Sequence, residues 1–300
     1  MSKKGVEQKP SETALFAAIY RTIVNIEKHN DVLGSDYLAE CFLPGLLKYL
    51  MRFKFIRENF KNKSHKLSPG IYEYVLARTA FFDTIFKDAL NNQIPQIVLL
   101  GAGYDTRPYR FANLNNSTRI FELEISPTQN RKKKCLAKAK IDIPEKVTLV
   151  PIDFNKEKLQ NVLEKAGYNR NANTLFIWEG VSYYLEPTSV DATLDFMKKN
   201  SPKESLVVFD YVVSLSDETV KNYYGAKEFT ETWKKRHLNE PFKFAINDGE
   251  IELFLEQRGL KIINHLDSEQ IEKMFLLQEN GSLIGKVSGI FRFTVASPAE

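Results

Sequence analysis

From Gln96 onward, short apolar runs alternate with segments of helical character. Five such runs of about five to eight residues lie at 96–101, 118–124, 146–153, 174–180 and 204–210. Strands that are buried on both faces have this nearly continuous apolar character, and helices between consecutive strands bring them into a parallel arrangement. The pattern predicts a doubly wound α/β fold.

Two further apolar runs lie at 259–266 and 285–297. A helical stretch, EQIEKMFL, and a turn at Asn280-Gly281 separate them, so we expect them to pair as a hairpin-like return. The sheet then has seven strands in a Rossmann-like arrangement. Residues 214–247 lack clear strand character and contain WKKRHLNEP, which indicates a helical lid inserted into the core.

The first ninety residues carry no strand signal. Apolar positions recur at helical spacing over 11–29, and a second helical stretch at 36–60 is interrupted by Pro44-Gly45. A polar, basic loop at 62–70 leads to a third helix at 71–90. We expect residues 1–90 to form a helical cap of the same domain as a core at 91–300, with the lid at about 214–247.

A glycine loop follows the first apolar run. Gly101-Ala102-Gly103 ends the predicted strand, and Asp105 or Thr106 can cap a helix that we expect to begin near Thr106. Glycine allows a tight turn and a close approach to a ligand, and a helix N-terminus presents free N–H groups. We therefore assign Gly101, Ala102, Gly103 and Asp105 to a cofactor site.

Two acids end the next apolar run. Glu122 and Glu124 lie 19 and 21 residues after Gly103, the spacing at which a carboxylate can accept hydrogen bonds from both hydroxyls of a ribose. The alternative interpretation is a tight turn beside two solvated carboxylates.

The choice of cofactor follows from the rest of the loop. A pyrophosphate-binding loop needs a third glycine where Thr106 stands, so NAD fits poorly. S-adenosylmethionine has a ribose and no phosphate, and we predict it as the cofactor. Asp153 ends the third run, where it can accept a hydrogen bond from the adenine amino group, and Phe154 can pack against the ring. Asp153 can also cap a helix that begins near Asn155.

Four motifs in this order resemble those of the leucine carboxyl methyltransferase family. They are Arg78-Thr79 with Asp83 in ARTAFFDTIF, the loop GAGYDTRPYRF, the strand FELEISP, and TLFIWEGVSYYL. The resemblance runs from the helix TALFAA to the strand FRFTVAS, which is most of the chain. It implies an S-adenosylmethionine-dependent methyltransferase of the family's bacterial polyketide-type branch.

The resemblance also implies a role for each site residue. The glycine loop holds the methionine part of the cofactor, Arg78 pairs with its carboxylate, Glu124 binds the ribose, Asp153 and Phe154 bind the adenine, and Glu179 lies beside the amino-acid moiety and the transfer site. The family usually has Asp where Glu124 stands. Because Glu is one methylene longer, either Glu122 or Glu124 can bind the ribose.

The residue chemistry supports these roles independently. A guanidinium such as that of Arg78 binds a carboxylate bidentately, and the alternative is a surface salt bridge. Glu179 ends an apolar strand at the edge where open α/β sheets bind ligands, and a carboxylate there needs solvent or a cation. Tyr183 and Tyr184 follow it and can line an acceptor pocket or fill the core. Glu179 and Tyr184 are our predicted catalytic residues.

The predicted reaction is O-methylation of a carboxylate, in a small molecule or at a protein C-terminus. A carboxylate is ionised at neutral pH and needs no general base, which agrees with the absence of a recognisable catalytic triad. The four histidines are scattered, and we expect structural or solvent-facing positions for His29, His65, His237 and His265. The candidates for a cation that orients the acceptor are Arg107, Arg110, Lys234, Lys235 and Arg236.

The charge is unevenly distributed. Residues 48–66 and 131–140 each carry a surplus of six positive charges, although the whole chain carries only +4. We expect the second island to be the solvated face of a helix and the first to attract an acidic acceptor. At this net charge we expect no nucleic-acid partner, and RNA modification is an alternative. Two further functions compete with methyl transfer, namely an NAD-dependent oxidoreductase and a non-catalytic protein that only binds the cofactor or a partner.

Cysteine usage and hydropathy point to the compartment. Cys41 and Cys135 form neither a disulfide framework nor metal-ligand spacing, so we expect no metal. The chain shows no signal peptide and no run of about 18 apolar residues. We expect a cytoplasmic protein without a membrane partner.

Overall fold

The chain folds around the predicted, mostly parallel sheet. The computed structural model describes residues 9–27, 35–154, 156–236 and 240–299, and in these residues the sheet has eight strands. Its order is β3-β2-β1-β4-β5-β8-β7, with the short β6 beside β5. The bounds are β1 Gln96–Leu100, β2 Arg119–Glu124, β3 Val147–Pro151, β4 Thr174–Trp178, β5 Leu206–Ser214, β6 Ile246–Asn247, β7 Leu260–Leu266 and β8 Phe291–Pro298.

Each predicted apolar run contains one strand. β1 to β5 pair in parallel, and β8 is antiparallel to both β5 and β7, which confirms the hairpin-like return. Two details differ from the prediction. The two-residue β6 lies within the expected lid, and β8 begins six residues later than its run, because the backbone N–H of Ser288 turns toward the carbonyl of Gly70 (3.3 Å).

The strand order determines where a ligand can bind. β1 lies between β2 and β4, so the connections that leave β1 and β4 diverge to opposite sides. Open α/β sheets bind ligands outside the carboxyl ends of their strands at such a point. The glycine loop after β1 and Glu179 after β4 both lie at this edge.

The described part of the first ninety residues is helical, as expected. It contains α1 (Glu12–Glu27), the 3₁₀ turn η1 (Ala39–Phe42), α2 (Gly45–Leu50), α3 (Lys54–Leu67) and α4 (Ile71–Asn91). The helical break at Pro44-Gly45 is confirmed, and of the loop predicted at 62–70 only residues 68–70 lie outside the helices. α3 continues to Leu67 because Phe60, Ser64 and Leu67 recur at helical spacing and face inward, despite the polar composition of the segment.

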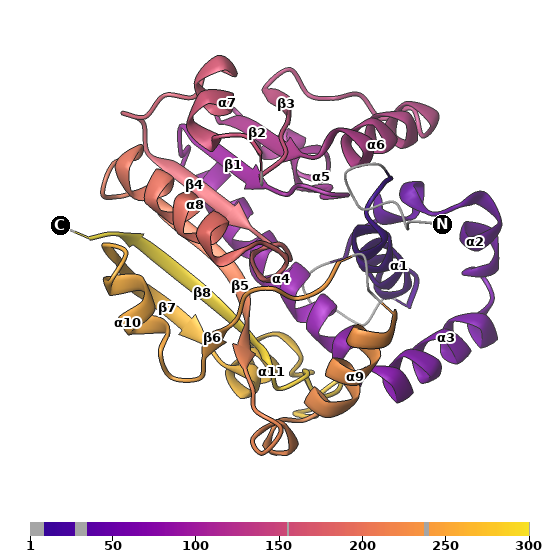
Figure 1. The fold of residues 1–300 in the computed structure, drawn as a ribbon. Coiled ribbons are helices and arrows are strands. Elements are labelled where there is room, and N and C mark those ends of the chain that lie inside the picture. The colour runs from indigo at the N-terminus through magenta and orange to yellow at the C-terminus, as the bar shows by residue number, and fades with distance from the viewer. Residues whose placement is uncertain (1–8, 28–34, 155, 237–239, 300) are drawn as a thin grey trace.

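Aromatic stacking joins the N-terminal helices to the sheet. The ring of Tyr74 on α4 stacks on Phe291 of β8, with centroids 3.6 Å apart, and Phe81 stacks on Phe293 at 4.8 Å. All four side chains are buried. The first helices are therefore packed into the same core as the last strand, as Figure 1 shows where α4 crosses behind the sheet.

The remaining helices follow the strands (Figure 1). α5, which begins at Arg107 with Thr106 as its cap, confirms the expected start but has only four residues. No helix in the described ranges is long and apolar enough to cross a membrane. The bounds are α5 Arg107–Arg110, α6 Ser126–Lys138, α7 Leu159–Lys165, α8 Pro187–Lys199, α9 Ala226–Arg236, α10 Ile251–Glu256 and α11 Ser268–Phe275, with 3₁₀ turns η2 Ala112–Leu114, η3 Ser182–Tyr184 and η4 Val220–Asn222.

Candidate active site

A cavity of about 760 Å³ opens at the carboxyl ends of β1, β2 and β4. This volume lies in the upper part of the range of about 300–1,000 Å³ that is typical of small-molecule sites. Residues from α1, α3, α4 and α9 complete its wall. The predicted site residues that line it are Arg78, Gly101, Ala102, Gly103, Asp105, Glu124, Asp153, Phe154, Glu179 and Tyr184.

The glycine loop forms one wall of the cavity. Gly101 has a positive φ of 66°, and a β-carbon there would lie 2.4 Å from Cγ2 of Val181, so only glycine fits this turn. The backbone N–H of Gly103 donates a hydrogen bond to Oε2 of Glu124 (2.6 Å), and that of Ile125 donates to Oε1 (2.9 Å). These bonds hold the Glu124 carboxylate directly beside the loop.

The two acids of β2 lie in different surroundings. Glu122 is 1% exposed, lies outside the cavity wall, and accepts a hydrogen bond from Nζ of Lys132 (2.7 Å). The structure therefore places only Glu124 at the cavity. Lys132 is itself buried, so the expectation that residues 131–140 form a purely solvated face is wrong at this position. Its ammonium compensates the Glu122 carboxylate, whose pKa is raised by burial.

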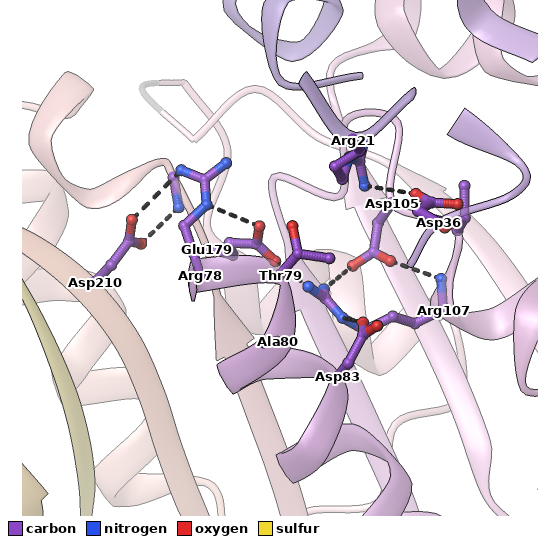
Figure 2. Close-up of polar contacts among 12 residues, drawn as sticks. Arg21, Asp36, Arg78, Thr79, Ala80, Asp83, Asp105, Arg107, Glu179 and Asp210 are labelled. Carbon is purple, nitrogen blue, oxygen red and sulfur yellow. Dashed lines mark hydrogen bonds and ion pairs between the residues drawn. The ribbon is translucent and has the colours of Figure 1, made fainter. Parts of the chain in front are cut away.

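Arg78 links the end of β4 to the middle of β5 through ion pairs. Its Nε lies 2.9 Å from Oε1 of Glu179, and its Nη1 lies 3.5 Å from Oδ2 of Asp210, as Figure 2 shows. Tyr74 donates a hydrogen bond to Asp210, and burial raises the pKa of that aspartate. Arg78 is buried, which excludes the alternative of a surface salt bridge.

Asp210 is a site-forming residue that the sequence reasoning missed. It accepts a hydrogen bond from the backbone N–H of Gly180 (2.6 Å), which fixes the turn after Glu179. A sequence signal existed, because Asp210 is the single charged residue within the apolar stretch Leu206–Ser214.

Arg107 and Arg110 do not face the cavity. Arg107 forms ion pairs with Asp83 (2.9 Å), Asp105 (2.6 Å) and Glu179, and Arg110 pairs with Asp83 at 2.7 Å. Both arginines are buried in this network, and Figure 2 shows Arg107 with Asp83 and Asp105. Burial disfavours ionisation of Asp105, but Arg107 beside it holds the pKa of Asp105 below its usual value. The prediction that either arginine orients an acceptor is therefore wrong.

Asp153 and Phe154 lie on the cavity wall near the end of β3. The predicted helix begins at Leu159, with Lys158 in the capping position, so Asp153 does not cap it. The backbone carbonyl of Asp153 accepts hydrogen bonds from the N–H groups of Lys156 (2.9 Å) and Glu157 (2.8 Å). This turn keeps Asp153 at the cavity; Asn155 lies outside the described residues.

Aromatic side chains from η3, α9 and the segment after it form one part of the cavity wall. Tyr184, Trp233 and Phe242 pack together, with centroids 4.8 Å apart for Trp233 and Phe242 and 5.4 Å for Tyr184 and Phe242. Tyr183 also lines the cavity, and its ring packs against Phe242. Both tyrosines therefore line the cavity and also pack against its other aromatic residues. Burial raises the pKa of Tyr184 well above its usual value, so its hydroxyl stays protonated.

Two lysines line the cavity instead of those predicted. Lys243 pairs with Glu186 (2.7 Å), whereas Lys63 of α3 has no carboxylate partner in the described part of the chain. Lys234 and Lys235 are exposed on α9 and do not line the cavity. The side chain of Arg236 lies outside the described set.

The histidines lie away from the cavity where the structure describes them. His65 is exposed on α3, and His265 shares a 3.1 Å hydrogen bond with Tyr211, which agrees with the expected structural or solvent-facing positions. His29 and His237 lie outside the described residues.

Comparison with known proteins agrees with this geometry. The sequence model of the leucine carboxyl methyltransferase family matches residues 14–198. A protein of Bacillus subtilis (strain 168), YktD, described as an S-adenosyl-L-methionine-dependent methyltransferase, is 31% identical over 266 residues, which are 85% of this chain and 86% of that protein. A protein of Mycobacterium sp. (strain JLS) with the same description is 29% identical over 66% of this chain and 65% of its own.

Two solved structures share the fold. A Thermobifida fusca YX protein described as a methyltransferase has a TM-score of 0.57 at 14% identity, covering 98% of this chain and 96% of its own. A DUF574 family protein of Streptomyces avermitilis MA-4680 has a TM-score of 0.59 at 13% identity, covering 98% and 99%.

Proposed function

Since the chain belongs to the leucine carboxyl methyltransferase family and is an S-adenosyl-L-methionine-dependent methyltransferase, we propose that it methylates a carboxylate oxygen of a small apolar acid. The proposal rests on the types of residue in the cavity wall. The described wall contains no histidine or cysteine, and its carboxylates are otherwise engaged: Glu124, Asp153 and Glu179 are assigned to the cofactor, Asp105 pairs with Arg107, and Glu240 accepts a hydrogen bond from the backbone N–H of Thr13. Lys63 supplies an unpaired cation in the described part of the wall. A carboxylate acceptor needs the cation and does not need the base.

The donor and acceptor groups of the cavity fit the cofactor. Glycines leave room at the loop, and Arg78 offers a fork for the cofactor's carboxylate. Glu124 can accept hydrogen bonds from the ribose hydroxyls, and Asp153 can accept one from the adenine amino group, with Phe154 against the ring. Glu179 lies 2.9 Å from Arg78, where its carboxylate can pair with the cofactor's ammonium.

When bound, S-adenosyl-L-methionine supplies a methyl group on a positively charged sulfur that leaves as a neutral thioether. The chain's own contribution is alignment, because a collinear arrangement of acceptor oxygen, methyl carbon and sulfur removes much of the entropic barrier. We assign this positioning to Glu179 on the cofactor side and to the protonated hydroxyl of Tyr184 on the acceptor side.

The aromatic part of the cavity wall favours an acceptor whose carboxylate is attached to an apolar group. Trp233, Phe242 and Tyr184 offer ring faces against which such a body can be buried, and aromatic contacts of this kind add to the hydrophobic gain. A protein C-terminus is the alternative acceptor, and it would have to insert its last side chain among the same rings.

The proposal is tested with methyl-labelled S-adenosyl-L-methionine and a panel of aromatic and aliphatic acids, with cell extract as a second acceptor source. A methyl ester releases volatile labelled methanol in mild alkali, whereas ethers and N-methyl groups keep their label. We expect alkali-labile product of small-molecule size. Alkali-stable label would refute the carboxylate acceptor and leave methyl transfer intact, and labelled protein would favour the C-terminal alternative.

A further inference from the structure

Apolar side chains are exposed together at the corner between α2 and α3. Leu46, Tyr49, Phe53 and Phe55 are 73%, 63%, 41% and 65% exposed, and no residue of α2 is buried. We refer to these four residues as the aromatic corner. Figure 1 shows α2 and α3 at one rim of the molecule, away from β7 and β8.

The aromatic corner is continuous. The rings of Tyr49 and Phe53 lie 5.5 Å apart between centroids, and those of Phe53 and Phe55 lie 6.0 Å apart. Leu46 lies three residues before Tyr49 on α2, on the same side of the helix. None of the four lines the cavity, so the active site does not account for their exposure. Contiguous exposed apolar groups of this kind mark an interaction surface.

Cations surround the aromatic corner. Lys48, Arg52 and Lys54 are interleaved with it, at most one residue from one of its members. Over 48–66 there are seven lysines and arginines, and among the described residues the carboxylates that pair with them are Glu27, Glu40 and Glu58. The three cations at the corner itself share the two carboxylates of Glu40 and Glu58, so the corner keeps a surplus of one positive charge.

The positive charge and the exposed apolar groups of the aromatic corner together favour one kind of binding partner over another. In a two-fold dimer the same patch would meet itself, so two cationic surfaces would be pressed together. An anionic lipid bilayer matches both features of the corner. Its headgroups attract lysine and arginine, and its interface accepts aromatic rings.

We propose that the aromatic corner binds the surface of anionic lipid bilayers, with Leu46, Tyr49, Phe53 and Phe55 inserted between the headgroups. This departs from the expectation of no membrane partner, which rested on the absence of a spanning segment and not on surface contact. The proposal is independent of the acceptor, because no residue of the aromatic corner belongs to the cavity wall.

The test is co-sedimentation of the full chain with phosphatidylcholine vesicles that contain either no phosphatidylglycerol or about a third of it. We expect binding only to the anionic vesicles, and we expect salt to weaken it. The variant L46S/F55S should lower the partition coefficient about tenfold or more, because two inserted side chains are lost. Its methyl transfer to a water-soluble acid should be unchanged.

A matched control removes apolar residues of similar exposure elsewhere. L253S/M274S changes α10 and α11 and should bind the vesicles like the parent protein. Equal binding by L46S/F55S and the parent, or no binding to anionic vesicles, would overturn the proposal. Light scattering that shows a dimer of the parent and a monomer of L46S/F55S would overturn it as well, in favour of a second copy.

Discussion

At the scale of single residues, burial separates two acids that the sequence presents as equivalent. Glu122 and Glu124 are two positions apart in β2, so their side chains leave the same face of the sheet. Glu122 lies deeper and pairs with Lys132, whereas Glu124 ends the strand beside the glycine loop. Their spacing in the sequence does not distinguish the two acids, because the difference between them comes from Lys132 on another element, α6, which pairs with Glu122.

The surroundings of Glu124 lead to a pH-dependent affinity for the cofactor. Burial raises the pKa of Glu124 to about 7, although the N–H groups of Gly103 and Ile125 act in the opposite direction. Ribose hydroxyls donate to the ionised carboxylate, so a proton must leave when the ligand binds below pH 7. We expect the affinity for S-adenosylhomocysteine to rise by up to about tenfold per pH unit up to pH 7 and then to level off.

Calorimetric titration between pH 5.5 and 8.5 measures this dependence. Glu124→Gln cannot ionise and should bind weakly with a flat profile, whereas Glu145→Gln, an exposed residue before β3, should keep the parent profile. A pH dependence that survives in Glu124→Gln would assign the titration to another group.

At the scale of elements, the end of α3 decides which cation reaches the cavity. A loop at 62–70 would leave the direction of each lysine open. Both lysines are exposed on the helix, but Lys63 lies at the cavity wall and Lys66, three residues further along, does not. The helical repeat therefore determines which lysine of this basic segment lies at the cavity.

Replacing these two lysines tests the selection. Lys63→Met should lower kcat/KM for an acidic acceptor by about ten- to a hundredfold, equivalent to about 1.4–2.8 kcal/mol, because a charge-assisted hydrogen bond to the carboxylate is lost. The affinity for S-adenosylhomocysteine should stay unchanged. Lys66→Met carries the same loss of charge and should be nearly neutral; equal effects of both variants would indicate a general electrostatic role.

The predictable part of the fold and the unpredictable part have different physical origins. The strands followed from continuous apolar runs and Gly101 from a glycine loop at a strand end, whereas the roles of Arg78 and Glu179 were implied by the family resemblance, with which their residue chemistry agrees. Asp210 was missed and Arg107 misassigned because both depend on which partners meet across the sheet edge. Whether a charged residue is buried in an ion pair can be predicted only when the fold shows which oppositely charged residue lies beside it.

At the scale of the whole molecule, the cavity draws its wall from segments that span most of the sequence. Thr13 of α1, Arg78 of α4, Glu179 after β4 and Phe291 of β8 all line it. A ligand that bridges such distant segments stabilises their common packing, so its binding free energy adds to the stability of the entire fold.

Thermal unfolding should report this coupling. At a hundred times its Kd, S-adenosylhomocysteine contributes about 2.7 kcal/mol, which at about 2–4 °C per kcal/mol corresponds to a rise in Tm of about 5–11 °C. We expect hydrogen exchange to slow in α1 and β8 as well as in the glycine loop. NAD at the same concentration should leave Tm unchanged; a comparable shift with NAD would point to a dinucleotide site.

The position of β8 also has a consequence for synthesis. β8 lies between β5 and β7, and its Phe291 supports both the cavity wall and Tyr74. The ribosome completes β5 at Ser214 and reaches β8 nearly eighty residues later, which takes about 4–16 s at ordinary elongation rates. During this interval the nascent chain already contains its glycine loop but exposes the edge of β5 and, after Leu266 has been added, that of β7. Such unpaired strand edges can aggregate, so we expect chaperones to bind the nascent chain in this interval.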